Sequence, residues 1–432
     1  MPKSRFSRHF QTVKNINIDL TRKIWDNQRK MTIGEVMFRF LTSGESHGKC
    51  LNAIIDGVPA GVPLIKEYID NELARRQIGY GRGGRMQIET DKAEINSGVR
   101  FGITTGAPIS LEIKNKDWEN WQIPMSVHPV DMSDLDNRLL VESKEITRIR
   151  PGHADFAGAM KYGHEDVRNV LERSSARETA ARVAVGAVAK SILKEFGIDG
   201  FSHVVRIGKI KAAGGADFET MKTAAENSDV RCADSEAAGL MRKEIDEAAQ
   251  IGDTLGGCVE IVFRNLPVGL GSFVQWDRRL DAKLAGAVMS IQAVKAVEIG
   301  MGKDVAAARG SETHDEVFFE NGEYSRKTNN AGGIEGGMTN GETLVVRASM
   351  KAIPTMKKPL KSVDIKTNQP FEAHFERSDT CAVPACGIVA EAMTAIVLAE
   401  AFLEKFGGDS VQEIRANYEN YLQYLNSRKG GN

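Results

Sequence analysis

The sequence predicts an α/β fold of α+β character, in which long alanine-rich helices pack closely against other layers. Three segments have the length and composition of such helices, at 177–196, 281–299 and 387–406. Strand-like segments gather before and after these helices and do not alternate strictly with them, which argues against a doubly wound parallel sheet. With 432 residues, the chain can bury a large core.

The first half of the chain opens on two strands that flank the glycine-rich turn Gly44–Gly48. A helix is expected at 65–77, because apolar residues recur there at helical spacing, and a loop of glycine and arginine follows at 79–86. The polar stretch 118–147 is expected to cover a site or an interface. Strands are expected at 38–41, 51–55, 94–99 and 109–114.

The helix at 177–196 has the clearest boundaries. Ser175 and Glu178 match an S-x-x-E capping box at its start, and Gly197 follows its end. An acidic, alanine-rich helical insertion is expected at 214–250. The helix at 281–299 follows this insertion, and the helix at 387–406 is closed by a pair of glycines.

The two ends of the chain differ from the rest. Residues 1–36 carry eight basic and three acidic side chains and no apolar stretch of signal-peptide length. We interpret them as a disordered tail or the product of an upstream start, with Met37 as the natural first residue; a basic targeting segment is the alternative. Residues 37–410 are expected to form a single catalytic domain, and 411–432 a polar C-terminal tail.

Composition and charge exclude several classes of protein. The formal net charge of −1 provides no overall attraction to nucleic acid or to an anionic membrane. No uninterrupted apolar run approaches the roughly 18 residues needed to span a bilayer. The five cysteines include no CxxC pair, and no H-E-x-x-H or paired Cys/His set occurs, so neither a disulfide framework nor a metal site is expected. These features favour a reduced, cytoplasmic protein.

Two common motifs match without their structural context. Residues 79–84 fit G-x-G-x-x-G, but the dinucleotide fingerprint needs a preceding strand, and a helix precedes it here. Residues 44–48 fit the nucleophile elbow G-x-S-x-G, which needs a following helix, whereas a strand is expected after Gly48. A serine hydrolase that uses Ser46 therefore stays only as an alternative.

Arginines among glycines predict a site for an anion. Arg75, Arg76, Arg82 and Arg85 lie within eleven residues that include four glycines. Glycine allows close approach of the backbone to a ligand, and arginine binds phosphate or carboxylate through paired hydrogen bonds. The run Arg173–Ser175, at the start of the clearest helix, is a second candidate, because helix N-termini attract anions.

Two histidines in glycine-containing turns predict acid–base chemistry on an anionic substrate. His47 lies in the turn Gly44–Gly48, and His153 follows Arg150, Pro151 and Gly152. Further along the chain, the glycine-rich loop 332–337 could lie against a flat ring or a phosphate. Residues 351–355 add a cation and a proline-containing turn, and 377–379 place an arginine beside a carboxylate.

Taken together, these motifs resemble those of the chorismate synthase family from about residue 37 to about residue 403. The matching motifs, in chain order, are GESHG at 44–48, RPGHAD at 150–155, RSSARE at 173–178, MSI-x-AVK-x-VEIG at 289–300, NAGG at 330–333 and RSD at 377–379. The resemblance implies a layered sandwich with long helices between antiparallel sheets, and a homotetramer.

The resemblance also implies an activity. Members of this family are phosphate-eliminating carbon–oxygen lyases, which convert 5-enolpyruvylshikimate 3-phosphate to chorismate and phosphate by an anti-1,4-elimination. This is the last step of the shikimate pathway, and it requires reduced FMN. Either NADPH or an external flavin reductase would supply the electrons. A flavin-binding protein that kept the fold but lost catalysis is the second alternative, although His47 and His153 are both intact.

Site residues carry over by position. The resemblance implies that His47 protonates the departing phosphate, that His153 interacts with the reduced flavin and helps to protonate it, and that Asp379, paired with Ser46, relays a proton. Arg76 and Arg82 match positions that contact substrate or a nicotinamide phosphate. The implied FMN contacts are Arg173, Ser174, Ser175, Gln292, Ala293, Gly336, Lys351, Ala352, Ile353, Pro354, Thr355 and Arg377. Gln292 stands where many members have asparagine, and Ala352 where proline is common.

Overall fold

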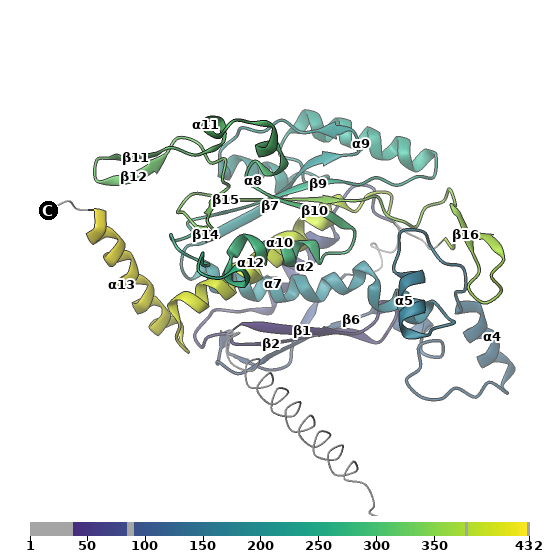
Figure 1. Cartoon of the computed structure of the whole chain (residues 1–432). Coiled ribbons are helices and arrows are strands. Elements are labelled where there is room, and N and C mark those ends of the chain that lie inside the picture. Colours follow the sequence, from purple (N-terminus) through teal and green to yellow (C-terminus); the bar gives the residue numbers. More distant parts are fainter. Residues whose placement is uncertain (1–37, 84–89, 376–378, 430–432) are drawn as a thin grey trace, which may run out of the picture. The chain divides into compact units, whose positions relative to one another are not determined.

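The computed structural model describes residues 38–83, 90–375 and 379–429. The chain divides into two units, Met1–Met37 and Phe38–Asn432, so the predicted N-terminal tail lies outside the described residues, and the second unit alone is considered below. Its described part forms three main layers, with long helices between two antiparallel sheets (Figure 1). The predicted fold class is therefore confirmed.

The first sheet has four antiparallel strands in the order β1-β2-β6-β3. Its alternating buried positions, such as Leu51, Ala53 and Ile55 on β2, face the helices. The strands are β1 Arg39–Ser43, β2 Cys50–Asp56, β3 Ala93–Ile95 and β6 Ile109–Lys114. Because strand β2 begins two residues after Gly48, the nucleophile-elbow interpretation lacks its required helix.

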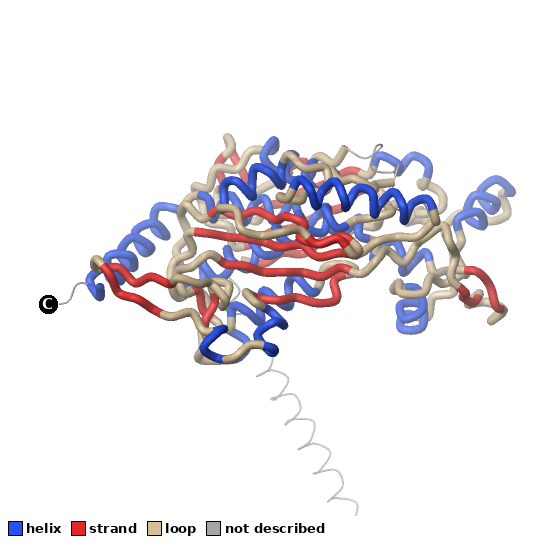
Figure 2. The backbone as a smooth tube through the Cα atoms, turned by 90° about the horizontal axis from the view of Figure 1, so that it is seen from above, coloured by secondary structure: helices blue, strands red, loops and turns tan. Residues whose placement is uncertain are grey.

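The second sheet has five antiparallel strands in the order β10-β15-β9-β7-β8. The view from above in Figure 2 shows helices lying over long strands. The strands are β7 Asp199–Ile207, β8 Ile210–Lys211, β9 Gly257–Arg264, β10 Val294–Ile299 and β15 Leu344–Met350. The predicted insertion at 214–250 forms two helices beside β7 and β8, α8 Phe218–Glu226 and α9 Ser235–Gln250.

Four helices fill the space between the sheets: α2 Lys66–Gln77, α7 Thr179–Lys194, α10 Leu280–Met289 and α12 Val383–Phe406. Small side chains allow their close approach, since a Cβ at Gly186 on α7 would overlap Ala392 on α12. Within the described residues, α12 alone is long and apolar enough to cross a membrane, although the sequence showed no such uninterrupted run. Since 94% of its most apolar window is buried, α12 is a core helix of this fold.

Two local predictions were wrong. The predicted helix at 281–299 ends at Met289, and the chain then turns through Ala293, which has a φ of 69°, into strand β10. β-branched residues at 294, 297 and 299 favour that strand. The predicted capping box is also absent, because it needs the Ser175 hydroxyl to accept from the Glu178 backbone amide. The Ser175 hydroxyl instead accepts from the Arg177 backbone amide, and the Glu178 carboxylate accepts from the Arg182 guanidinium. A short 3₁₀ turn, Ala176–Glu178, precedes α7.

The remaining elements are short or peripheral, apart from α13 Val411–Lys429, a helix in the segment that was expected to be a polar tail. The other helices are α4 Leu135–Lys144, α5 Asp155–Tyr162, α6 Arg168–Ser174 and α11 Gly310–Thr313. The paired short strands are β4 Val99–Arg100 with β5 Ile103–Thr104, β11 Val317–Glu320 with β12 Glu323–Arg326, β13 Ile334–Glu335 with β14 Met338–Thr339, and β16 Lys361–Val363 with β17 Pro370–Glu372. The 3₁₀ turns elsewhere are Lys116–Asn120, Trp276–Arg278 and Gly302–Ala307.

A buried ionic cluster joins the helices of the middle layer. The Glu391 carboxylate on α12 accepts hydrogen bonds from Arg75 on α2, from Lys190 on α7 and from the Ser202 hydroxyl on β7. Burial opposes ionisation of Glu391, but the charges of Arg75 and Lys190 outweigh it and hold the pKa of this carboxyl well below its ordinary range.

We expect Glu391→Ala to lower the free energy of unfolding by about 3–5 kcal/mol, because two buried cations lose a partner. Glu400→Ala is the matched control, since the Glu400–Lys283 pair is partly exposed and is expected to contribute at most about 1 kcal/mol. Urea unfolding measures both. Because the pKa of Glu391 is lower in the folded chain than in the unfolded chain, its contribution to the free energy of unfolding is present above the unfolded pKa of about 4.3. That contribution is lost as the pH falls below this value. Equal losses in the two variants would contradict this account.

Candidate active site

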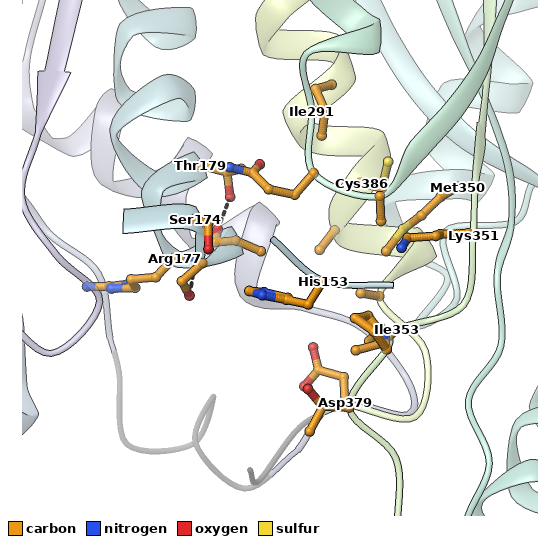
Figure 3. Close-up of a pocket in the computed structure, with 18 of the residues that line it drawn as sticks. His153, Ser174, Arg177, Thr179, Ile291, Met350, Lys351, Ile353, Asp379 and Cys386 are labelled. Atoms are coloured by element: carbon orange, nitrogen blue, oxygen red, sulfur yellow. Dashed lines mark hydrogen bonds between the residues drawn. The ribbon is translucent and has the colours of Figure 1, made fainter. Parts of the chain in front are cut away.

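A cavity of about 570 Å³ lies where loops from both halves of the chain meet the starts of α7 and α12. Figure 3 shows His153 near its centre, with Ser174, Arg177 and Thr179 on one side and Met350, Lys351 and Cys386 on the other. The predicted site residues that line it are Ser46, His47, Arg76, Arg82, His153, Ser174, Ser175, Gln292, Ala293, Lys351, Ile353, Pro354, Thr355 and Asp379.

His47 is held at the cavity wall by a buried carboxylate. Its Nδ1 lies 2.8 Å from Oε1 of Glu172, and its backbone amide donates to Oε2 of the same carboxylate over 2.7 Å. Arg168 also donates to Oε1, over 2.9 Å. Burial would raise the pKa of Glu172, but the hydrogen bond from His47 and the nearby cationic groups outweigh burial and lower it. The carboxylate thus leaves Nε2 of His47 for contact with a ligand.

His153 has the same kind of support. Its Nδ1 lies 2.5 Å from Oδ1 of Asp155, whose side chain is fully buried. Arg150 binds both oxygens of that carboxylate, from Nε over 2.8 Å and from Nη2 over 2.9 Å. Although burial opposes ionisation, these contacts hold the pKa of Asp155 far below its usual range. Each cavity histidine is therefore backed by an ionised carboxylate that an arginine also binds.

Arginines held by carboxylates form the cationic part of the cavity. Asp91, buried behind the wall, pairs with Nη2 of Arg76 at 2.7 Å and with Nη1 of Arg177 at 2.5 Å. Burial, together with the charges of Arg177 and Arg82, lowers the pKa of Arg76 to about 10 even though Asp91 opposes the shift. Arg82 pairs with Asp379 at 3.1 Å. A bound anion would relieve the mutual repulsion of these cations.

Two lysines add to the positive charge of the arginines in this cavity. Lys295 on β10 and Lys351, just after β15, both line the cavity. Burial and the charge of Lys295 lower the pKa of Lys351, whose ammonium donates to the carbonyl of Gly152. The cavity is therefore suited to a ligand with more than one anionic group.

An apolar surface also lines the cavity. It consists of small and medium side chains from α12 and the neighbouring loops, and it can accept the face of a planar ring. Burial raises the pKa of the Cys386 thiol to about 12, so this cysteine serves as a small apolar residue. The residues are Ile291, Met350, Ile353, Ala382, Ala385, Cys386 and Val389.

Three predicted FMN contacts do not line the cavity, and a fourth lies outside the described residues. Arg173 donates to the carbonyl oxygens of Thr42 at 2.9 Å and Gly44 at 3.1 Å, so it braces the turn that carries His47. Ala352 does not line the cavity, Gly336 is exposed in the turn between β13 and β14, and Arg377 lies outside the described residues.

Sequence reasoning missed several residues that shape the site. Glu172, Asp155 and Asp91 hold its histidines and arginines, and Trp121 stacks on His47 with ring centroids 4.0 Å apart. Asp155 was visible within the motif at 150–155, and Glu172 directly precedes the motif at 173–178. Asp91 and Trp121 had no comparable signal. Trp121 belongs to the stretch 118–147, which was expected to cover a site; it does not line the cavity but stacks on His47, which does.

Comparison with known proteins agrees with these motifs. The family model for chorismate synthase matches residues 38–403. The chorismate synthase of Geobacter sulfurreducens is 57% identical over 398 residues, covering 90% of this chain and 99% of the relative, and that of Carboxydothermus hydrogenoformans is 54% identical over 391 residues, covering 90% and 99%. A crystal structure of chorismate synthase superposes with a TM-score of 0.72 at 42% identity, covering 90% of this chain and 98% of that one. The chain belongs to the chorismate synthase family and is a lyase.

Proposed function

We propose that this chain eliminates phosphate from 5-enolpyruvylshikimate 3-phosphate in an anti-1,4 sense to give chorismate, with reduced FMN as cofactor. The observation that carries the proposal is the pair of carboxylate-backed histidines, His47 and His153, in a cavity with both cationic and apolar surfaces. The substrate bears one phosphate and two carboxylates, which suits Arg76, Arg82 and Arg177.

The residues present also fit FMN. Among the described residues, the Ser174 hydroxyl and the Gln292 side-chain oxygen have no hydrogen-bond partner, although both residues line the cavity. Buried polar groups of this kind gain from a ligand. Ser174, Ser175, Gln292 and Lys351 would hold the polar parts of FMN, with its ring against the apolar surface. When bound, reduced FMN supplies an electron to the allylic system transiently, so the reaction needs no net oxidant.

The chain's own groups bind, orient and transfer protons. The cations place the phosphate, and Nε2 of His47 holds a proton for the departing phosphate oxygen. Because Nδ1 of His153 is engaged by Asp155, its Nε2 is the atom that exchanges a proton on the cofactor side. Asp379, fixed by Arg82 and by the Gly83 amide at 2.7 Å, would pass a proton on, and it lines the same cavity as Ser46.

The proposal extends to the setting of the enzyme. We propose a cytoplasmic homotetramer, with NADPH or an external flavin reductase as the source of electrons, as in the family. Analytical ultracentrifugation tests the assembly. Comparing turnover with NADPH plus FMN and with chemically reduced FMN tests the source of electrons.

An anaerobic assay tests the activity. The purified chain is mixed with 5-enolpyruvylshikimate 3-phosphate and chemically reduced FMN, and chorismate absorbance and free phosphate are followed together. Equal release of both, dependent on reduced flavin, is expected. FMN binding without release would instead indicate a non-catalytic flavoprotein, and labelling of Ser46 by a serine-directed phosphonate would indicate the hydrolase.

We expect Arg76→Ala to raise the KM for substrate about 10- to 100-fold, because a charge-assisted contact to an anion is lost. The dissociation constant for FMN should change less than about threefold, which corresponds to a change in binding free energy well under 1.4 kcal/mol. Arg100→Ala is the control, since Arg100 is an exposed arginine outside the cavity lining. An unchanged KM in Arg76→Ala would refute the substrate contact.

A further inference from the structure

The buried carboxylate of Glu172 has no role in the proton transfers proposed above, yet both of its oxygens make hydrogen-bond contacts at His47. Oε1 faces Nδ1 of His47 at 2.8 Å and Nη1 of Arg168 at 2.9 Å. Oε2 accepts from the His47 backbone amide at 2.7 Å and lies 3.0 Å from Nδ1. The Glu172 carbonyl also accepts from the Ser46 amide over 3.0 Å. One residue of α6 thus fixes both the backbone and the ring of His47.

These contacts determine where the imidazole carries its proton. The lowered pKa of Glu172 keeps the side chain ionised, and an ionised carboxylate only accepts hydrogen bonds. Nδ1 must therefore donate in both charge states of the ring. In the imidazolium the exchangeable proton is on Nε2, and when Nε2 gives it to the departing phosphate, the neutral ring keeps its proton on Nδ1.

The ring is also prevented from turning away. Trp121 stacks on it with an interplanar angle of 29° and is itself anchored by Nε1, which donates to Asp117 over 2.9 Å. Arg168 and Lys144 lie over the Trp121 ring at 4.8 and 4.5 Å. Since Arg168 also binds Glu172, the carboxylate and the stacking ring form one connected support.

We propose that Glu172 is a positioning residue that keeps Nδ1 of His47 protonated, so that Nε2 is the atom that gives its proton to the departing phosphate. This inference rests on the role proposed for His47. The second histidine is similar but not identical: Asp155 lies 2.5 Å from its Nδ1 and pairs with Arg150, whose Nη2 lies 3.1 Å from the same Nδ1. In both rings, Nδ1 faces a buried carboxylate.

Glu172→Gln tests this inference because an amide cannot reproduce both contacts. If the amide oxygen faces Nδ1, the amide NH₂ meets the His47 backbone N–H, and two donors face each other. If the amide turns over, its NH₂ faces Nδ1 and stabilises the opposite tautomer. We expect kcat to fall about 10- to 100-fold, in the range of other supporting contacts, and KM and the FMN dissociation constant to change less than about threefold.

A double-mutant cycle separates positioning from general structural damage. If Glu172 acts through His47, Glu172→Gln should change kcat less than about twofold in a His47→Ala background. Equal losses in both backgrounds, or no loss in the wild-type background, would overturn the inference. The same cycle with Glu172→Asp, which keeps the charge but shortens the reach, applies if the glutamine variant does not fold.

Two controls complete the experiment. Glu165→Gln makes the same chemical change at an exposed position between α5 and α6 and should leave kcat unchanged. Turnover by the wild-type chain is measured in parallel. Its absence would refute the proposed function, whereas wild-type turnover with additive losses in the cycle refutes only the positioning role.

Discussion

His47→Ala is expected to lower kcat by about 10²- to 10⁴-fold, the usual range for loss of a positioned proton donor. In the proposed reaction the leaving group is a phosphate, and without Nε2 of His47 it must depart with its full charge. FMN binding should persist, because the predicted flavin contacts that line the cavity, such as Ser174 and Gln292, lie on other segments. The measurement is anaerobic turnover with reduced FMN, together with titration of FMN fluorescence.

His47→Asn is the matched variant for this prediction. Its side-chain amide can donate to Glu172 as Nδ1 does, so it preserves the buried pair while removing Nε2. We expect it to be as slow as the alanine variant but more stable to urea. Normal turnover in His47→Asn would refute proton donation by this ring and leave His47 as a structural residue.

Much of the cavity could be predicted because its residues lie in short motifs with unusual chemistry. Histidine beside glycine at 47 and 153, and arginine among glycines at 76 and 82, are rare combinations that mark ligand sites without knowledge of the fold. The α+β character followed from strands that gather before and after the long helices, and the layered sandwich from the family resemblance. The alanine-rich composition predicted close packing of the helices, as in the close approach of Gly186 to Ala392.

The supporting carboxylates could not be found in this way. Aspartate and glutamate are common surface residues, and Glu172 becomes a partner of His47 only when the fold brings together positions 125 residues apart. Asp91 likewise binds Arg177 across 86 residues. The wrong helix at 281–299 has a related cause, because short apolar runs fit helix and strand alike, and the turn at Ala293 has no local signal.

The second large effect is expected for His153. We expect His153→Ala to lower kcat about 10²- to 10⁴-fold, because the cavity then lacks its other proton-exchanging ring. Asp155 keeps both contacts from Arg150, so the fold should persist. Anaerobic turnover measures the effect, and circular dichroism checks the fold.

His153→Asn distinguishes proton exchange from support of Arg150. The asparagine amide can donate to Asp155 in place of Nδ1 but cannot exchange a proton with a ligand. Equal loss of kcat in the asparagine and alanine variants, with FMN binding retained, is expected if Nε2 transfers a proton. Full activity in His153→Asn would mean that the ring only completes the hydrogen bonds of Asp155, and the proton on the cofactor side would then have to come from Asp379, whose carboxylate lines the same cavity.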